Sequence, residues 1–142
     1  MTPSDPDPDH PATPPAAAVP ARAFAKSRND IGRLVRAMVY SWQGVRAAWR
    51  HEAAFRLEVM LGLPLLAVAA WAAPGRWHAL ALGLSVLAVW IVELLNSAVE
   101  ALADAVSVER HPLIGRAKDM ASAAVTFSLL ALALTWGAVF WP

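Results

Sequence analysis

The chain contains no cysteine and few charged residues. Without cysteine it has no disulfide framework, no thiolate metal ligand and no cysteine nucleophile, although this absence does not identify a compartment. Charged residues make up 16% of the 142 residues, whereas a typical soluble domain has about 25%. The net charge is +1, so the chain lacks the strong positive field with which many proteins capture nucleic acid.

Two familiar nucleotide-binding patterns are also missing. The sequence has no G-x-x-x-x-G-K-[ST] loop, and its seven glycines are scattered along the chain. The motifs of protein kinases are absent as well. A protein with this sequence that uses ATP must therefore bind it in a different way.

Proline is concentrated at the N-terminus, where seven of the eleven prolines precede Ala21. Such a segment buries too little apolar surface to offset the entropy cost of ordering, so residues 1–25 are predicted to form a disordered tail. The tail lacks the basic start and the continuous apolar core of a signal peptide. Residues 26–142 are predicted to form a single membrane domain.

A helical pattern begins at Asp30. Apolar residues recur at the spacing of one helix face from Ile31 to Trp49, and the opposite face carries Gln43 and four arginines. This distribution predicts an amphipathic helix over about residues 30–50, lying flat on the membrane surface. The alternative is an ordinary bundle helix with a solvated basic face.

Apolar residues dominate the rest of the chain. They make up 58% of all residues, and the mean hydropathy is +0.45. Three runs are long enough to cross a membrane, which predicts transmembrane helices at about residues 55–73, 77–103 and 119–141. Pro74 and Gly75 would form the turn between the first two spans, and Ala105–Arg116 the longer loop before the third.

The basic residues predict the orientation of these spans. Eleven of the twelve lie before the first span or around the second loop, and only Arg76 lies in the first loop. The N-terminus and the second loop are therefore predicted to be cytoplasmic, and the C-terminus periplasmic. An aromatic belt at the outer interface would then contain Trp71, Trp77, Trp136 and Trp141.

Polar residues interrupt the apolar run Ala79–Ala103. Glu93, Asn96 and Glu100 fall on one helix face, and Asp104 follows on the same stripe. Acidic groups at membrane depth usually mark an ion, proton or substrate site, although Glu93 pairing with a basic group or staying protonated in a helix contact is the alternative. Glu93 would lie roughly 16 Å deeper than Asp104, whereas Glu100 is shallow enough to hold Mg²⁺ together with Glu52.

Four sequence blocks resemble the signature blocks of prokaryotic diacylglycerol kinases. They are YSWQGVRAAW (Tyr40–Trp49), EAAFRLE (Glu52–Glu58), IVELLNSAVE (Ile91–Glu100) and GRAKDMASAAV (Gly115–Val125). The resemblance extends from about Ile31 to Trp141. It implies an all-α inner-membrane protein, with a surface helix and three transmembrane helices, that assembles as a homotrimer with active sites between subunits. It also implies that ATP phosphorylates the primary hydroxyl of diacylglycerol to give phosphatidic acid.

The same resemblance implies roles for individual residues. Glu93 would be the general base with Asn96 beside it, and Glu52 and Glu100 would hold the Mg²⁺ of ATP. The ATP-binding residues would be Arg33, Arg36, Tyr40, Glu52, Glu100, Glu109, His111, Lys118 and Asp119. The residues in contact with the lipid would be Ser41, Arg46, Trp49, Glu58, Trp71, Glu93 and Ser122.

Other functions stay open at this point. The HPL sequence at His111–Leu113 looks more like the undecaprenol kinases of the same family, for which a polyprenol is the acceptor. A buried glutamate also suits a small proton- or ion-coupled membrane carrier, but a carrier would not need several charged residues converging on the cytoplasmic side. A purely structural subunit would leave the acidic stripe without a role.

Overall fold

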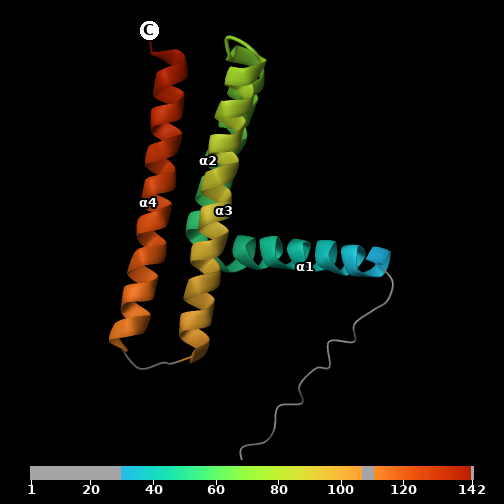
Figure 1. Ribbon diagram of the computed structural model, residues 1–142, viewed down its shortest axis with the longest axis vertical. Coiled ribbons are helices and arrows are strands. Elements are labelled where there is room, and N and C mark those ends of the chain that lie inside the picture. Colours follow the sequence, from blue (N-terminus) through green and yellow to red (C-terminus); the bar gives the residue numbers. More distant parts are fainter. Residues whose placement is uncertain (1–29, 107–110, 142) are drawn as a thin grey trace, which may run out of the picture.

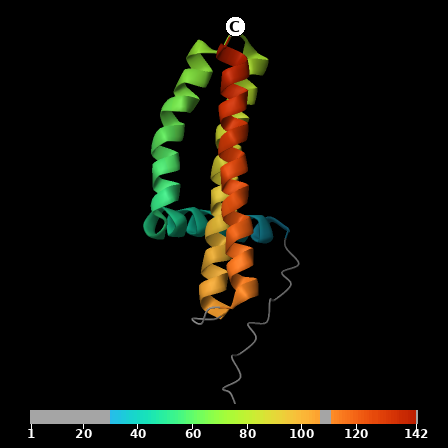
Figure 2. The same ribbon diagram turned by 90° about the vertical axis from the view of Figure 1, so that its left-hand side faces the viewer.

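A computed structural model describes residues 30–106 and 111–141. These residues form the helices α1 (Asp30–His51), α2 (Ala53–Ala72), α3 (Arg76–Val106) and α4 (Pro112–Phe140). Helices α2, α3 and α4 run alongside one another, and α1 extends sideways from them (Figure 1). In the view of Figure 2, α4 lies in front of α3 and α2 lies to one side. The predicted tail, residues 1–25, lies outside the described residues.

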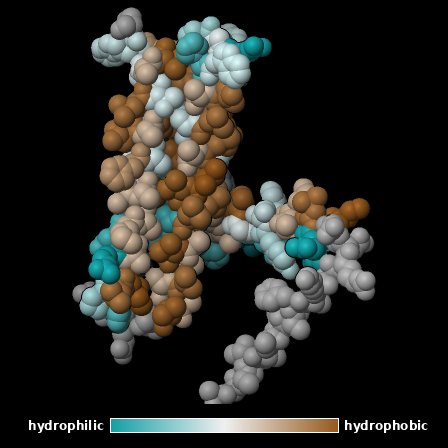
Figure 3. Space-filling model, viewed as in Figure 1, coloured by the Kyte–Doolittle hydropathy of each residue, from teal (hydrophilic) through white to brown (hydrophobic). Residues whose placement is uncertain are grey.

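Three of the described helices are long and apolar enough to cross a membrane. They contain 20, 31 and 29 residues for α2, α3 and α4 respectively, and a span needs about 20. The prediction of three candidate spans is therefore confirmed. Hydrophobic side chains cover much of the bundle formed by α2, α3 and α4 on the face shown in Figure 3.

The loop before α4 differs from the prediction. Helix α4 begins at Pro112, so residues 112–116, which were predicted to belong to the loop Ala105–Arg116, are helical. Proline suits the first helical position, where its missing N–H has no helical partner to lose. The His111 side chain caps the new end, because its Nδ1 accepts a hydrogen bond from the Leu113 N–H at 3.2 Å. Pro112 therefore starts this helix instead of breaking it.

The corner between α1 and α2 consists of one residue. Glu52 has an extended backbone, with φ −104° and ψ 113°, and its N–H donates to the Ala48 carbonyl at 2.8 Å. Arg56 on α2 reaches back to the end of α1, donating to the carbonyls of Trp49 at 3.1 Å and Arg50 at 3.3 Å. These bonds satisfy carbonyls that a helix end leaves free. They hold Glu52 at a defined place beside the bundle.

Helix α3 is central, because it contacts each of the other three helices. From Leu82 to Ser97 its buried side chains recur every three or four residues, which is the spacing of a helix–helix packing face. They are Leu82, Val86, Val89, Glu93, Ser97 and Ala103. Helix α4 has no buried residue among those described. Most of the buried residues of the described chain therefore lie on one stripe of α3, with Phe55, Gly62 and Ala69 of α2 and Ala48 of α1 also buried, and the α3 stripe contains a glutamate.

Two tryptophans donate hydrogen bonds between the spanning helices. Trp136 donates from Nε1 to the Ser85 hydroxyl at 3.3 Å, linking α4 to α3. Trp90 donates to the Glu58 carbonyl at 3.1 Å, linking α3 to α2. Trp71, Trp77 and Trp141 are exposed, whereas Trp136 is half-buried. Trp136 therefore also fixes α4 against α3, beyond its predicted place in the outer belt.

Candidate active site

The acidic stripe of α3 runs from a buried end to an exposed end. Glu93 is 3% exposed, Asn96 and Glu100 are half-buried, and the Asp104 side chain is 75% exposed. Because α3 is one continuous helix, the side chains keep the angular spacing expected from the sequence. Glu93 thus occupies a core position while Asp104 is accessible.

Two polar atoms on this stripe lack partners. Asn96 donates from Nδ2 to the Glu100 carboxylate at 3.2 Å, which leaves its own oxygen free. The Asn96 Oδ1 and the Ser97 hydroxyl are buried and have no hydrogen-bond partner among the described residues. A buried polar atom without a partner costs about 1–3 kcal/mol. Both atoms are therefore places where a bound molecule would gain a hydrogen bond.

Three carboxyl groups lie around Glu93, from the corner between α1 and α2, from α2 and from α3. Glu52 and Glu58 are half-buried, and one carboxylate oxygen of Glu58 is buried without a partner in the described chain. Glu52, Glu58 and Glu100 lie close enough to Glu93 to interact with it electrostatically. Within the described residues, no basic side chain forms an ion pair with Glu93. This finding argues against the alternative in which Glu93 serves only as a structural ion-pair partner.

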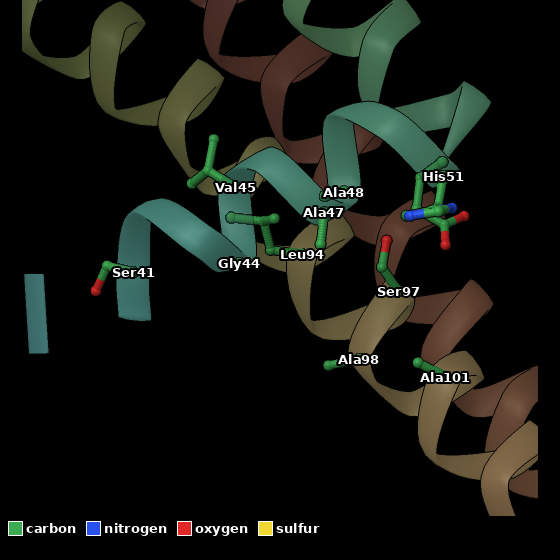
Figure 4. Close-up of a pocket in the computed structure, with 11 residues that line it drawn as sticks. Ser41, Gly44, Val45, Ala47, Ala48, His51, Leu94, Ser97, Ala98 and Ala101 are labelled. Atoms are coloured by element: carbon green, nitrogen blue, oxygen red, sulfur yellow. The ribbon is translucent and has the colours of Figure 1, made fainter. Parts of the chain in front are cut away.

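A pocket of about 560 Å³ opens between α1 and α3. Figure 4 shows Ser41 at one end of it, and the Ser97 hydroxyl pointing to the side where His51 lies. Glu52 also lines the pocket, and the remaining wall is apolar, formed by Gly44, Val45, Ala47, Ala48, Leu94, Ala98 and Ala101. Such a cavity, with apolar walls and a few polar groups, suits a small or amphiphilic ligand.

Lys118 on α4 faces the shallow end of the stripe. Its Nζ lies 3.3 Å from the Asp104 carboxylate, and its side chain is 40% exposed. Asp119 and His111 are exposed nearby on the same helix end, and Glu109 lies outside the described residues. The α3–α4 packing thus brings one predicted ATP-binding cation to the acidic stripe.

Other predicted residues are not gathered by the single chain. Arg33, Arg36 and Tyr40 are exposed on α1, and within the described residues α1 has no contact with α4. Helix α1 projects away from α4 (Figure 1). Residues 30–106 and 111–141 contain no cluster of three or more His, Asp or Glu side chains suited to a metal ion. One chain alone therefore does not assemble the predicted ATP site.

The predicted lipid contacts are also spread over the molecule. Ser41 lines the pocket between α1 and α3, and Arg46 and Trp49 line a second groove of about 360 Å³ with Trp42 and Val45. Trp71 is exposed at the far end of α2, and Ser122 is exposed on α4. The single chain therefore groups the α1 residues but separates them from Trp71 and Ser122.

Two residues of the site were missed from sequence. Ser97 lies within the E-x-x-N-S-x-x-E pattern, four residues after Glu93, so its helical spacing was a usable signal. Trp90 lies three residues before Glu93, but nothing in the sequence indicates its bond to α2. Both residues are neutral, so neither stands out in an apolar run as a charged residue does.

Comparison with known proteins gives consistent matches. The family model described as "Prokaryotic diacylglycerol kinase" matches residues 39–140. The chain is 43% identical to the diacylglycerol kinase of Escherichia coli K12 over 118 residues, covering 83% of this chain and 97% of that protein. It is 45% identical to the diacylglycerol kinase of Pseudomonas aeruginosa over 115 residues, covering 80% and 93%. The corresponding protein of Haemophilus influenzae is 39% identical over 106 residues, covering 75% and 90%.

Proposed function

Since this chain belongs to the prokaryotic diacylglycerol kinase family, we propose that it transfers a phosphoryl group from ATP to the primary hydroxyl of diacylglycerol, giving phosphatidic acid. Membership of a kinase family sets the membrane carrier aside. The observation that carries the proposal is the Glu93 carboxyl group, which is 3% exposed and is followed on α3 by half-buried Asn96 and Glu100.

Glu93 acts as the general base. One of its carboxylate oxygens takes the proton from the lipid hydroxyl while the hydroxyl oxygen forms a bond to the γ-phosphorus of ATP. The bond between that phosphorus and the bridging oxygen breaks, and ADP leaves. Asn96, three residues further along α3, orients the groups between the base and Glu100. Burial of Glu93 supports this role, because it keeps water from competing for the carboxylate.

Glu52 and Glu100 hold the Mg²⁺ that accompanies ATP. Both offer carboxylate oxygens, and the buried Asn96 Oδ1 beside Glu100 has no hydrogen-bond partner in the described chain. Mg²⁺ usually takes one or two carboxylates together with substrate phosphates. When bound, the ion neutralises charge on the phosphates.

The nucleotide is bound between copies of the chain, which assemble as a homotrimer. Lys118 neutralises phosphate charge, with Arg33, Arg36, Tyr40, Glu109, His111 and Asp119 around the nucleotide. Support comes from the lack of contact between α1 and α4 in the described residues. An α1 helix from one copy beside α4 of another would bring the two sets together.

The acceptor lipid lies along α1 and the face of α3. The residues that contact the lipid, in addition to Glu93, are Ser41, Arg46, Trp49, Glu58, Trp71 and Ser122. Two observations support this placement: the apolar pocket that Ser41 lines and the groove that Arg46 and Trp49 line. Tryptophan and arginine side chains suit the boundary between acyl chains and headgroups.

The protein resides in a bacterial inner membrane with its N-terminus and the loop before α4 in the cytoplasm. Eleven basic residues on that side against Arg76 on the other support this orientation. ATP then reaches Glu100 and Lys118 from the cytoplasm. Helix α1 lies on the cytoplasmic surface, with its tryptophans toward the lipid.

One assay tests the class of reaction and the acceptor together. Purified protein in detergent micelles is given γ-labelled ATP, Mg²⁺ and either diacylglycerol or undecaprenol, and micelles without a lipid alcohol serve as the control. Label is expected in phosphatidic acid. Label in undecaprenyl phosphate alone would instead support the second candidate, which the HPL sequence at His111–Leu113 favours. Label in neither lipid would refute both.

A further inference from the structure

Trp90 joins α3 to α2 at a glycine. Its indole N–H donates to the Glu58 backbone carbonyl at 3.1 Å. A Cβ atom added to Gly62 would lie 2.7 Å from Cζ2 and 2.9 Å from Nε1 of the Trp90 ring. It would also lie 2.9 Å from a methyl carbon of Val86. The ring therefore fills the space that a side chain at position 62 would need.

Helix α2 is weak in the turn that Trp90 contacts. Gly62 has the highest conformational entropy to lose in a helix. Pro64 lies inside the same helix, and it has no N–H to donate to the carbonyl of Met60. Within a membrane no water replaces that missing bond. The bond from Trp90 to the Glu58 carbonyl, one turn before Gly62 and two residues before Met60, therefore ties α2 to α3 beside this weak turn.

The same contact lies beside two functional carboxyl groups. Glu93 follows Trp90 by three residues, slightly less than one turn, and Glu58 supplies the carbonyl that Trp90 binds. Any shift of α2 against the Trp90 ring changes the separation of Glu58 and Glu93, which interact electrostatically. The corner at Glu52 is held separately, by Arg56 and the end of α1.

We infer that Trp90, seated in the notch at Gly62, is a positioning residue that sets the spacing of Glu58 and Glu93 around the acceptor lipid. Its kinetic consequence rests on the proposed function. The chemistry itself stays with Glu93. Trp90 acts by holding α2, and hence Glu58, at one distance from the base.

Substituting the glycine tests this inference. Gly62→Ala forces α2 away from the ring, so kcat is expected to fall roughly 10- to 100-fold, because small misplacements of reacting groups are costly. The KM for MgATP is expected to stay within about twofold, since the Glu52 corner and Lys118 are held by other contacts. Gly83→Ala is the matched control. Its added Cβ would meet only Leu66 at 3.8 Å, and its kcat is expected to match wild type.

Two further variants separate packing from hydrogen bonding. Trp90→Phe keeps a ring near Gly62 but deletes the N–H donor, and a smaller fall in kcat with unchanged KM for MgATP is expected. Trp90→Leu removes the ring from the space beside Gly62. Adding Gly62→Ala to the Trp90→Leu protein is therefore expected to lower kcat only slightly further. The double variant should therefore match Trp90→Leu alone instead of showing the product of both single losses.

Kinetics on folded protein and SDS-induced unfolding decide the outcome. A folded Gly62→Ala protein with wild-type kcat, or a double variant whose losses multiply, would overturn the inference. If the Gly62→Ala protein does not fold, the Trp90→Phe protein tests the inference by itself. A Trp90→Phe protein with wild-type kcat would then overturn the inference. If wild type phosphorylates neither lipid alcohol, the proposed function fails. The unfolding energies of the same variants still test the contact, and additive effects at positions 62 and 90 would refute it.

Discussion

The carboxyl groups of Glu93 and Asp104 lie on one face of α3 but differ widely in their exposure to solvent. Glu93 is 3% exposed, whereas the Asp104 side chain is 75% exposed and lies 3.3 Å from Lys118. A buried carboxylate has no competing water, so it suits proton transfer from a substrate. An exposed one gains little from its ion pair, about 0–1 kcal/mol. Position along the stripe therefore separates the proposed base, Glu93, from a solvated charge, Asp104.

The first prediction concerns the base. Glu93→Gln keeps the size and the hydrogen-bonding capacity of the side chain but removes the proton acceptor. Turnover is expected to fall by roughly 10²–10⁴, while SDS-induced unfolding shows a protein at least as stable as wild type. Lipid phosphorylation in micelles measures the first effect. A purified variant that kept more than a tenth of wild-type kcat would show that Glu93 is not the base.

The second prediction concerns the metal. Glu52→Gln and Glu100→Gln are each expected to weaken the use of MgATP, and raising Mg²⁺ should recover part of the activity, because each variant loses one carboxylate ligand. The measurement is a Mg²⁺ titration of lipid phosphorylation. Asp104→Asn is the matched control, since it removes the same charge from an exposed position on α3, and its Mg²⁺ dependence should stay as in wild type. Activity that is low at every Mg²⁺ concentration would argue against coordination by these residues.

At the scale of whole elements, two sets of contacts decide how the helices meet: those at the corner between α1 and α2, and those between α3 and α4. One extended residue, Glu52, turns the chain from α1 into α2, and Arg56 ties the two helices together. Helix α4 is joined to α3 by packing and by the bond from Trp136 to Ser85. Helix α1 therefore keeps its direction relative to α2, and α4 keeps its register along α3.

The third prediction concerns α1. Replacing both Trp42 and Trp49 with Asp is expected to lift this helix from the headgroups, because two apolar anchors become charged. Turnover should drop at least tenfold as Arg33, Arg36 and Tyr40 move away from the nucleotide. Gln43→Asp, on the predicted polar face, is the control and should stay near wild type. Deleting residues 1–25 should likewise leave activity intact, since the Pro- and Asp-rich sequence offers little apolar surface for packing.

The outcome of this comparison is decided in a single micelle assay of all three proteins. An inactive tail deletion beside a fully active double-Asp protein would contradict the division between tail and helix.

The fourth prediction concerns the link between α3 and α4. Ser85→Ala removes the acceptor of the Trp136 N–H, so the free energy of unfolding is expected to fall by about 0.5–2 kcal/mol. Ser128→Ala is the control, because the Ser128 hydroxyl donates only to the Val125 carbonyl of its own helix. SDS-induced unfolding compares the two. Equal stability of both variants would show that the interhelical bond contributes nothing.

At the scale of the whole molecule, the described chain leaves much of its apolar surface uncovered. Helix α4 buries no described residue, and large apolar side chains are exposed on all four helices. Lipid covers part of this surface in a membrane. The predicted ATP-binding residues on α1 and α4 nevertheless remain apart in one chain, which favours an assembly that unites them.

The fifth prediction tests that assembly by mixing. Arg36→Met on α1 and Lys118→Met on α4 are each expected to be nearly inactive, because each removes a positive charge that we propose binds the phosphates of ATP. Co-assembled one to one, they should regain roughly a quarter of wild-type activity, since random mixing leaves some shared sites with both residues intact. Co-assembly is verified with two affinity tags. A tagged mixture without recovered activity would place both residues in the same subunit's site.

Local patterns in the sequence were sufficient to predict the helices. Uncharged runs of spanning length predicted three candidate spans, because a membrane-spanning helix must satisfy its own backbone hydrogen bonds in apolar surroundings. The spacing of Glu93, Asn96 and Glu100 placed them on one face, since helical geometry depends only on sequence separation. The family resemblance was carried by blocks read directly from the chain. The predicted loop Ala105–Arg116 ran too far, because Pro112 can both break and begin a helix, and only its neighbours decide which.

What the tertiary structure alone decided were the contacts between residues distant in sequence. Burial of Glu93 depends on the other helices that pack against α3, and no spacing within α3 determines which of its faces is covered. The bond from Trp90 to Glu58 joins residues 32 positions apart, and the notch at Gly62 is meaningful only with the Trp90 ring inside it. Periodicity orients side chains around one helix axis. The distances between helices follow from close packing of particular side chains, and those distances set the chemistry of the site.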